Sequence, residues 1–307
     1  MSKRKEMKRY LFVILLLMAS VPAFSGLRSA LVSRSPREKS CVERDTTRSA
    51  MPSALLMVHF GTSYDETRTL TIDAVNELAR SSFPDLEVRE AWTSRMIVKK
   101  LKSRGVVKPL PVEALMRLRA DGYTRVLVQP TTLLEGAEMA SLRRDVESLA
   151  PFFDEIRVGE PLLYSVDDCR KVAEILLQRH GDKADAKKHA HVVFVGHGTY
   201  APANATYSQM EHLFQHLGGP LFHVATIEGY PTLETLLADL KAAKARKVTL
   251  VPMLLVAGDH ATNDISGEWK EALEAAGLEV EVVLEGLGQV PEIQRRYMDH
   301  VAELQGK

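Results

Sequence analysis

The sequence of 307 residues contains very little cysteine and no excess charge of either sign. Its two cysteines, Cys41 and Cys169, are too few for a disulfide scaffold, a cysteine-rich zinc site or a four-cysteine iron–sulfur cluster. Any metal is therefore expected to be held mainly by nitrogen and oxygen ligands. The 40 basic and 40 acidic residues balance, so nothing indicates a polyanion-binding surface, and no nucleic-acid partner is expected.

Several familiar catalytic motifs are also missing from the sequence. There is no GxGxxG or Walker A segment, and thus no dinucleotide or nucleotide fingerprint. Neither a GxSxG nucleophile elbow nor an HExxH zinc helix is present. We therefore expect chemistry that requires neither a nucleotide nor a redox cofactor.

The first 25 residues have the three-part pattern of a secretory signal peptide. The segment "MSKRKEMKR" is basic, "YLFVILLLMAS" is apolar, and Ala23 and Ser25 precede Gly26. The apolar stretch is shorter than the roughly 20 residues of a membrane span, and an uncleaved anchor is the alternative. Residues 26–52 are polar without a clear period and are predicted to be a linker. We expect an exported protein with no membrane contact once the signal peptide is cleaved.

From residue 53 onward, strand-like segments alternate with amphipathic helical segments. Strands are predicted at 54–60, 87–92, 124–130, 155–161, 191–196, 222–228, 247–256 and 279–286. Helix boundaries are indicated by Ser165 as an N-cap, by Gly218 and Gly277 near helix C-termini, and by Pro291 at the start of the last helix. Near-continuous apolar strands that alternate with helices predict an α/β fold with parallel sheets covered on both faces.

Two features recur in the same order in both halves of this region. "FGTSY" (60–64) and "HGTY" (197–200) each follow the first strand of a half. "VQPTTLLEGAEMA" (128–140) and "LVPMLLVAGDHAT" (250–262) share the spacing from proline to glycine and to an ionisable residue. We therefore predict a duplicated α/β domain, with halves at 53–185 and 186–307. His197 then takes the place of Phe60, and His260 that of Glu138.

Three candidate metal ligands lie at strand ends in the second half, where open parallel sheets bind ligands. They are His197, Glu228 in "TIEGYPT" and His260 in "AGDHATND". Two imidazoles and a carboxylate suit a divalent transition metal, and three ligands leave positions open for chemistry. Nearby glycines are expected to give a flat or bulky ligand room to approach: Gly196, Gly198 and Gly258.

Structural roles compete with this prediction. A lone strand-end histidine is more often structural than ligating, and Glu228 could simply favour the positive end of a helix near Thr232. The matched positions of His197 and His260 favour a joint role. His59 and His223 are ambiguous. The remaining histidines are predicted to lie at the surface: His180, His189, His191, His212, His216 and His300.

Over roughly residues 53–305 the sequence resembles the anaerobic-pathway sirohydrochlorin cobaltochelatases of the class II chelatase superfamily. The resemblance is carried by "HFGTSYDETRTLTIDA", "AWTSRMIVKKL", "VQPTTLLEGAEM", "VGHGTYAPAN", "IEGYPTLE" and "LVPMLLVAGDHATNDISG". It implies two Rossmann-like halves with a tetrapyrrole in the cleft between them. The paired family histidines match His197 and His260, the acidic metal-site residue matches Glu228, and a cleft-facing glutamate matches Glu138. The sequence departs from the family at Thr131 or Thr132, where a histidine is expected.

The resemblance also implies a reaction, namely ATP-independent insertion of Co²⁺ into sirohydrochlorin for cobalamin biosynthesis. His197, Glu228 and His260 would hold the metal, and His197 or, in preference, His260 would accept a pyrrole proton. Fe²⁺ is an alternative substrate metal. Together with the signal peptide, the resemblance points to the periplasmic branch of the family. The substrate's carboxylates would be bound near Thr62, Ser63, Arg95 and Glu138, with Arg68 and Lys99 as further donors.

Rival functions share much of this sequence evidence. A periplasmic metal or tetrapyrrole carrier would bind without turnover, and a ferrochelatase acting on sirohydrochlorin would use the same residues. A sugar- or phosphate-binding protein with two α/β lobes would show no metal dependence. The sequence does not fix the oligomeric state, and a homo-oligomer is compatible with it.

Overall fold

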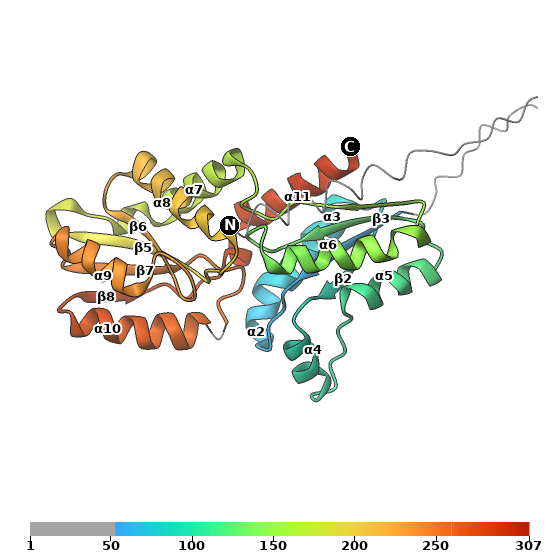
Figure 1. The fold of residues 1–307 in the computed structure, drawn as a ribbon, viewed down its shortest axis with the longest axis horizontal. Coiled ribbons are helices and arrows are strands. Elements are labelled where there is room, and N and C mark those ends of the chain that lie inside the picture. Colours follow the sequence, from blue (N-terminus) through green and yellow to red (C-terminus); the bar gives the residue numbers. More distant parts are fainter. Residues whose placement is uncertain (1–52, 259, 307) are drawn as a thin grey trace, which may run out of the picture. The chain divides into compact units, whose positions relative to one another are not determined.

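The computed structural model describes residues 53–258 and 260–306, with the side chains of residues 260–262 left out. The predicted signal peptide (1–25), the predicted linker (26–52) and Cys41 lie outside the described residues. The described chain forms two four-stranded parallel sheets flanked by helices (Figure 1). This confirms the predicted α/β class and its two Rossmann-like halves. No helix in this part of the chain is both long and apolar enough to cross a membrane.

The first sheet has the strand order β2-β1-β3-β4. Its strands are β1 (Ser53–His59), β2 (Glu87–Trp92), β3 (Arg125–Pro130) and β4 (Glu155–Val158). The helical elements that accompany it are α2 (Asp65–Arg68), η2 (Thr69–Asp73), α3 (Ala74–Ser82), α4 (Arg95–Lys102), α5 (Pro111–Ala120) and α6 (Ala137–Leu149).

The second sheet repeats this arrangement with the order β6-β5-β7-β8. Its strands are β5 (Ala190–Gly196), β6 (Phe222–Thr226), β7 (Lys247–Pro252) and β8 (Glu279–Val282). Its main helical elements are α8 (Ala205–Gly218), α9 (Leu233–Ala242), the π-helix η7 (His260–Trp269) and α10 (Lys270–Ala275). Because β1 and β5 each lie between the second and third strands of their half, His197 follows β5 as Phe60 follows β1.

All eight predicted strands are present, but four of them end two or more residues earlier than predicted, and β1 ends one residue earlier. The segments predicted at 155–161, 222–228, 247–256 and 279–286 leave their sheets after Val158, Thr226, Pro252 and Val282. Pro252 has no N–H to donate, which favours the end of the ladder there. The apolar residues after it, Met253–Val256, line a cleft instead of extending β7. Apolar character alone does not distinguish these two environments.

Two helices pack across the boundary between the halves. α7 (Val166–His180) packs on α8, and α11 (Pro291–Gly306) packs on α3 and β3. The Tyr297 hydroxyl of α11 donates to the Thr131 carbonyl at 2.9 Å. One hydrophobic core therefore includes Leu55 of the first sheet and Phe194 of the second. The boundary predicted near residue 185 falls between α7 and β5.

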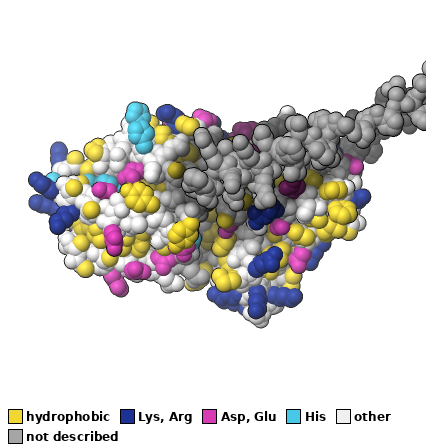
Figure 2. All heavy atoms as spheres, in the orientation of Figure 1, with side chains coloured by type: hydrophobic (Ala, Val, Ile, Leu, Met, Phe, Trp, Pro, Cys, Tyr) yellow, Lys and Arg dark blue, Asp and Glu magenta, His cyan; other side chains and the backbone are white. Residues whose placement is uncertain are grey.

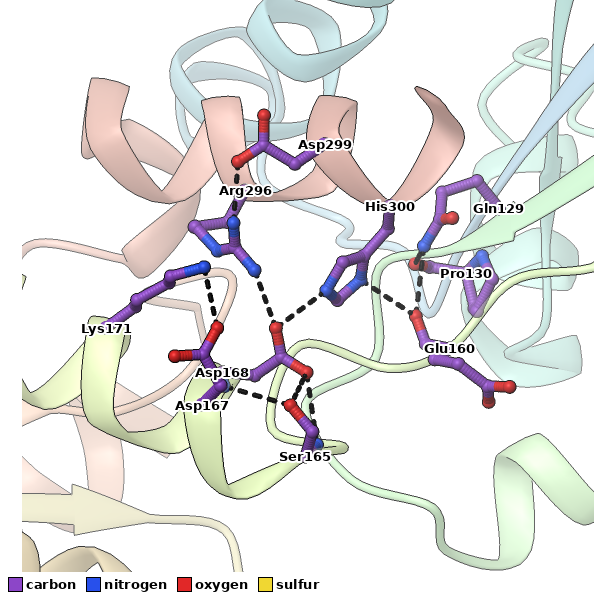
Figure 3. A network of polar contacts seen from close by, with 10 residues as sticks. All are labelled: Gln129, Pro130, Glu160, Ser165, Asp167, Asp168, Lys171, Arg296, Asp299 and His300. Carbon is purple, nitrogen blue, oxygen red and sulfur yellow. Dashed lines mark hydrogen bonds and ion pairs between the residues drawn. The ribbon is translucent and has the colours of Figure 1, made fainter. Parts of the chain in front are cut away.

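A polar cluster joins α7 to α11 around Asp168 (Figure 3). Its carboxylate accepts hydrogen bonds from Arg296 at 2.6 Å and from His300 Nε2 at 3.0 Å. The Ser165 hydroxyl donates to it at 2.6 Å and accepts from the Asp168 amide, so Ser165 is the N-cap of α7 as predicted. Pro291 opens α11, also as predicted.

The prediction that six histidines lie at the surface is wrong for His180, His191 and His300. Their exposures are 5%, 2% and 4%. His191 lies in the core strand β5 and hydrogen-bonds to His223 of β6, while His300 is covered by the Asp168 cluster. Their polar sequence neighbours did not reveal these partners, which are distant along the chain.

Candidate active site

A cleft of about 500 Å³ lies at the carboxyl ends of the strands of both sheets. The first half contributes Phe60, Thr62 and Glu138 to its lining, and the second half contributes His197 and Glu228. The lining includes no lysine or arginine among the described residues. The cleft is therefore largely apolar, with a few polar groups that converge on it.

His197 and Glu228 are brought together by the loops that follow β5 and β6. The Glu228 amide donates to the His197 carbonyl at 2.7 Å, and the Ile227 amide donates to the Gly196 carbonyl at 3.0 Å. His197 Nδ1 lies 3.1 Å from the Gly198 carbonyl, which can only accept. Nδ1 therefore carries the proton, and the lone pair of the neutral ring is on Nε2.

The glycines beside His197 serve packing within the protein. Gly198 has φ +86, and a Cβ there would lie 2.4 Å from the Gly229 nitrogen. A Cβ at Gly196 would lie 2.1 Å from the Tyr207 ring. Gly196 does not line the cleft, so the expectation that it gives a ligand room is wrong, whereas Gly198 does line the cleft and leaves its backbone open to a ligand there. Gly258 lines the cleft, and a Cβ there would make only ordinary contacts, so the expectation holds for it.

His260, the third predicted ligand, is the first residue of η7, and its side chain lies outside the described residues. Leu255, Val256 and Gly258 line the cleft, and His260 is two residues further along the sequence. Among the described side chains, no group of three or more His, Cys, Asp or Glu is placed to hold a metal. His197 and Glu228 are two of the three predicted ligands, so the full set stays a prediction.

Glu138 is the second residue of α6 and enters the cleft from the first half. It is half-buried, and no other described residue forms an ion pair or a hydrogen bond with its carboxylate. Burial raises the pKa of Glu138 to about 7. A carboxyl with this pKa can exchange a proton near neutral pH, which is a property of catalytic acids and bases.

The predicted carboxylate donors are not equally close to the cleft. Thr62 lines it, whereas Ser63 is buried outside the lining and its carbonyl accepts from Arg104. Arg95 is exposed at the start of α4 and does not line the cleft, although its neighbours Ser94 and Met96 do. Arg68 forms ion pairs within its own helical segment. Substrate binding by Thr62, Ser63 and Arg95 stays a prediction.

A buried polar chain behind the cleft wall was not predicted. His59 is fully buried at the end of β1, with Nε2 2.9 Å from Asn76 Oδ1 and Nδ1 2.9 Å from Thr131 Oγ1. Asn76 donates to Glu90, which also accepts from Lys108. Burial lowers the pKa of His59, so the ring is held neutral. Thr131, one of the two positions where the family resemblance leads to a histidine, thus binds a histidine from β1.

Exposed apolar side chains from both halves were also missed. Phe60 is 46% exposed, Met96 81% and Tyr200 93%, and all three line the cleft. Large apolar groups so open to water at a concave site suit a flat apolar ligand. Tyr200 follows the glycine-flanked histidine within "HGTY", which is the one sequence signal that could have revealed it.

Comparisons with known proteins agree with the predicted family and fold. The chain matches the family described as cobalt chelatase (CbiK) over residues 53–305. It is 36% identical over 256 residues to a sirohydrochlorin cobaltochelatase of Salmonella typhimurium, covering 82% of this chain and 96% of that relative. It is 32% identical over 253 residues to sirohydrochlorin cobaltochelatase CbiKC of Nitratidesulfovibrio vulgaris, covering 80% and 88% of the two chains.

Solved structures share the fold at low sequence identity. SirB from Bacillus subtilis with Fe³⁺ has a TM-score of 0.62 at 18% identity, and the match covers 84% of this chain and 98% of that chain. SirB from Bacillus subtilis subspecies spizizenii in complex with cobalt has a TM-score of 0.59 at 17% identity, covering 82% and 95%. At these identities the likeness concerns the fold alone.

Proposed function

The chain belongs to the cobalt chelatase (CbiK) family, and we propose that it inserts Co²⁺ into sirohydrochlorin. Two relatives that share at least 32% identity are named for this substrate. The observation that supports the proposal most is that His197 and Glu228, whose loops are joined by a backbone hydrogen bond, both line a cleft of about 500 Å³. The apolar lining suits a flat macrocycle, and the paired groups suit a divalent metal.

In this proposal, the second half of the cleft delivers the metal. His197 offers Nε2, since Nδ1 donates to the Gly198 carbonyl, and Glu228 offers a carboxylate from the adjoining loop. His260 completes the set from the segment that continues the cleft wall. Three ligands hold Co²⁺ while leaving positions for the macrocycle nitrogens.

Insertion displaces the pyrrolic protons, which need acceptors in the cleft. His260 is the proposed first acceptor once the metal has passed to the macrocycle and its nitrogen is released. Glu138 faces the cleft from the other half with a pKa near neutrality. Neutral imidazole and a carboxylate of this pKa both accept protons at about pH 7. The absence of nucleotide motifs supports an ATP-independent reaction, and the signal-peptide pattern supports a periplasmic location.

The test mixes the chain from Gly26 onward with sirohydrochlorin and Co²⁺ without ATP and follows the macrocycle absorbance. We expect turnover above a protein-free control and losses of about 100-fold or more in His197→Ala, Glu228→Gln and His260→Ala. His212→Ala is the matched control, because His212 is exposed on α8 outside the cleft.

Other outcomes favour the alternatives. Stoichiometric binding without turnover favours a carrier, and faster insertion of Fe²⁺ than of Co²⁺ favours a ferrochelatase. Full activity of all three site variants would overturn the proposed ligand set.

A further inference from the structure

Helix α4 carries a local excess of positive charge in a chain of net charge zero. It contains no acidic residue, and its four cations are all exposed: Arg95, Lys99, Lys100 and Lys102. No ion pair or hydrogen bond joins any of these four side chains to another described residue, whereas Lys108, six residues after Lys102, is paired with Glu90. Figure 2 shows dark blue side chains gathered where Figure 1 places α4.

This arrangement stabilises one end of the helix and weakens the other. Arg95 is the first residue of α4, where the positive end of the helix disfavours a cation. Lys99 lies one turn further along the same side, and like charges at that spacing also weaken a helix. Lys99, Lys100 and Lys102 lie in the last turn, where the negative end of the helix favours cations. The helix end does not neutralise four exposed cations that have no acidic residue beside them in α4, and an anionic ligand would.

The same helix begins at the mouth of the cleft. Its N-cap Ser94 and its residues Met96 and Ile97 line the cleft, and Met96 is 81% exposed. Lys100 lies one helical turn beyond Met96, so a cation follows the apolar contact on one side of α4. The cleft interior offers no lysine or arginine, and its acidic groups, Glu138 and Glu228, disfavour an anion.

We propose that α4 is the capture element for a flat ligand with peripheral carboxylates. The apolar ring enters the cleft beside Met96, and the carboxylates stay at the rim, where Lys99, Lys100 and Lys102 bind them. This inference rests on the proposed function, since it names how the macrocycle substrate is recognised. The carboxylate-binding role that the sequence predicts for Arg95 is thereby assigned to three lysines of the same helix, outside the cleft.

The test compares two triple variants with the same change in net charge. One is Lys99→Gln, Lys100→Gln and Lys102→Gln on α4. The control is Lys187→Gln, Lys241→Gln and Lys244→Gln, three exposed lysines before β5, in α9 and before β7, at the edge of the second sheet opposite the cleft. At low salt we expect the α4 variant to raise KM for sirohydrochlorin about tenfold with kcat unchanged. The control should match the parent protein.

Salt and a second readout separate this inference from the proposed function. At about 0.5 M salt, where screening reduces the reach of exposed charges to about 4 Å, the difference should disappear. Without any metal, fluorescence should show weaker binding of carboxylate-rich uroporphyrin by the α4 variant, and little change for carboxylate-poor mesoporphyrin. This binding assay supports α4 even if the protein inserts no cobalt. Equal effects of both triple variants, or an α4 effect that persists at high salt, would overturn the proposal.

Discussion

Glu138 shows how one residue in the cleft can lower the stability of the folded state. It is half-buried at the start of α6 without a partner among the described side chains, and burial raises its pKa from the usual 4.5 to about 7. The folded state therefore favours the protonated carboxyl. Below about pH 4.5 both states are protonated and no penalty exists, whereas stability is lost as the pH rises from 4.5 to 7. Above pH 7 the full penalty applies.

Replacing Glu138 with glutamine should remove this penalty. At about pH 8 we expect Glu138→Gln to be more stable than the parent by up to about 3 kcal/mol, with no gain at about pH 4.5. Urea unfolding at the two pH values measures the difference. Glu147→Gln, exposed on the same helix, is the control. A gain that is the same at both pH values would show that the carboxylate charge is not the cause.

The residue types of the site could be predicted, but several of their environments could not. His197 and Glu228 line one cleft as expected, because strand ends of a parallel sheet meet at one edge. A side chain at position 196 would clash with the ring of Tyr207, so glycine is needed there. His59 is buried because Asn76 and Thr131 form hydrogen bonds with its ring. These partners come together only when helices pack on the sheet, and no local pattern announces them.

At the scale of whole elements, apolar runs in the sequence predicted where the strands lie, but they did not predict where several of the strands end. Periodicity also predicts an apolar helix face without saying which sheet covers it. α7 and α11 are the examples. The predicted division assigns α7 to the first half and α11 to the second, but each packs against the other half. The Asp168 cluster joins the two helices, because Asp168 of α7 accepts hydrogen bonds from Arg296 and His300 of α11 (Figure 3).

Asp168→Asn tests how strongly the cluster holds the two helices. Burial alone would raise the pKa of Asp168, but hydrogen bonds from Ser165, His300 and Arg296 outweigh it and lower the pKa to about 2. Its contribution is therefore present above the usual 3.8 and is lost as the pH falls from 3.8 to about 2. At neutral pH we expect a loss of about 2 kcal/mol in unfolding free energy, because the lowered pKa measures how strongly the cluster stabilises the charged carboxylate. Arg296 keeps its ion pair with Asp299 in this variant.

A matched change next to Asp168 separates this effect from a general loss of charge. Asp167 is exposed and pairs with Lys171 within α7. Asp167→Asn should change the unfolding free energy by less than about 0.5 kcal/mol in the same urea titration. If both variants lose the same stability, the cluster does not hold the helices together.

Across the whole molecule, a buried histidine and a buried carboxyl change the unfolding free energy in opposite directions as the pH changes. His191 of β5 and His223 of β6 are buried, with Nδ1 and Nε2 2.9 Å apart, so one proton serves both atoms. Burial, and then the neighbouring His191, lower the pKa of His223 from 6.5 to about 4. The unfolded chain takes up protons below about pH 6.5 while the folded one does not, so stability falls between pH 6.5 and 4. Glu138 changes stability in the opposite direction over much of this range.

His223→Gln should therefore make the protein less sensitive to acid. Its unfolding free energy should fall less than that of the parent between about pH 6.5 and pH 4, by up to about 3 kcal/mol, because glutamine cannot take up the proton. Glu138→Gln should steepen the same fall, because it removes the opposing contribution. His212→Gln, exposed on α8, should leave the curve unchanged. Urea unfolding across this range measures all four proteins, and parallel curves for His223→Gln and the parent would mean that the histidine pair does not govern acid stability.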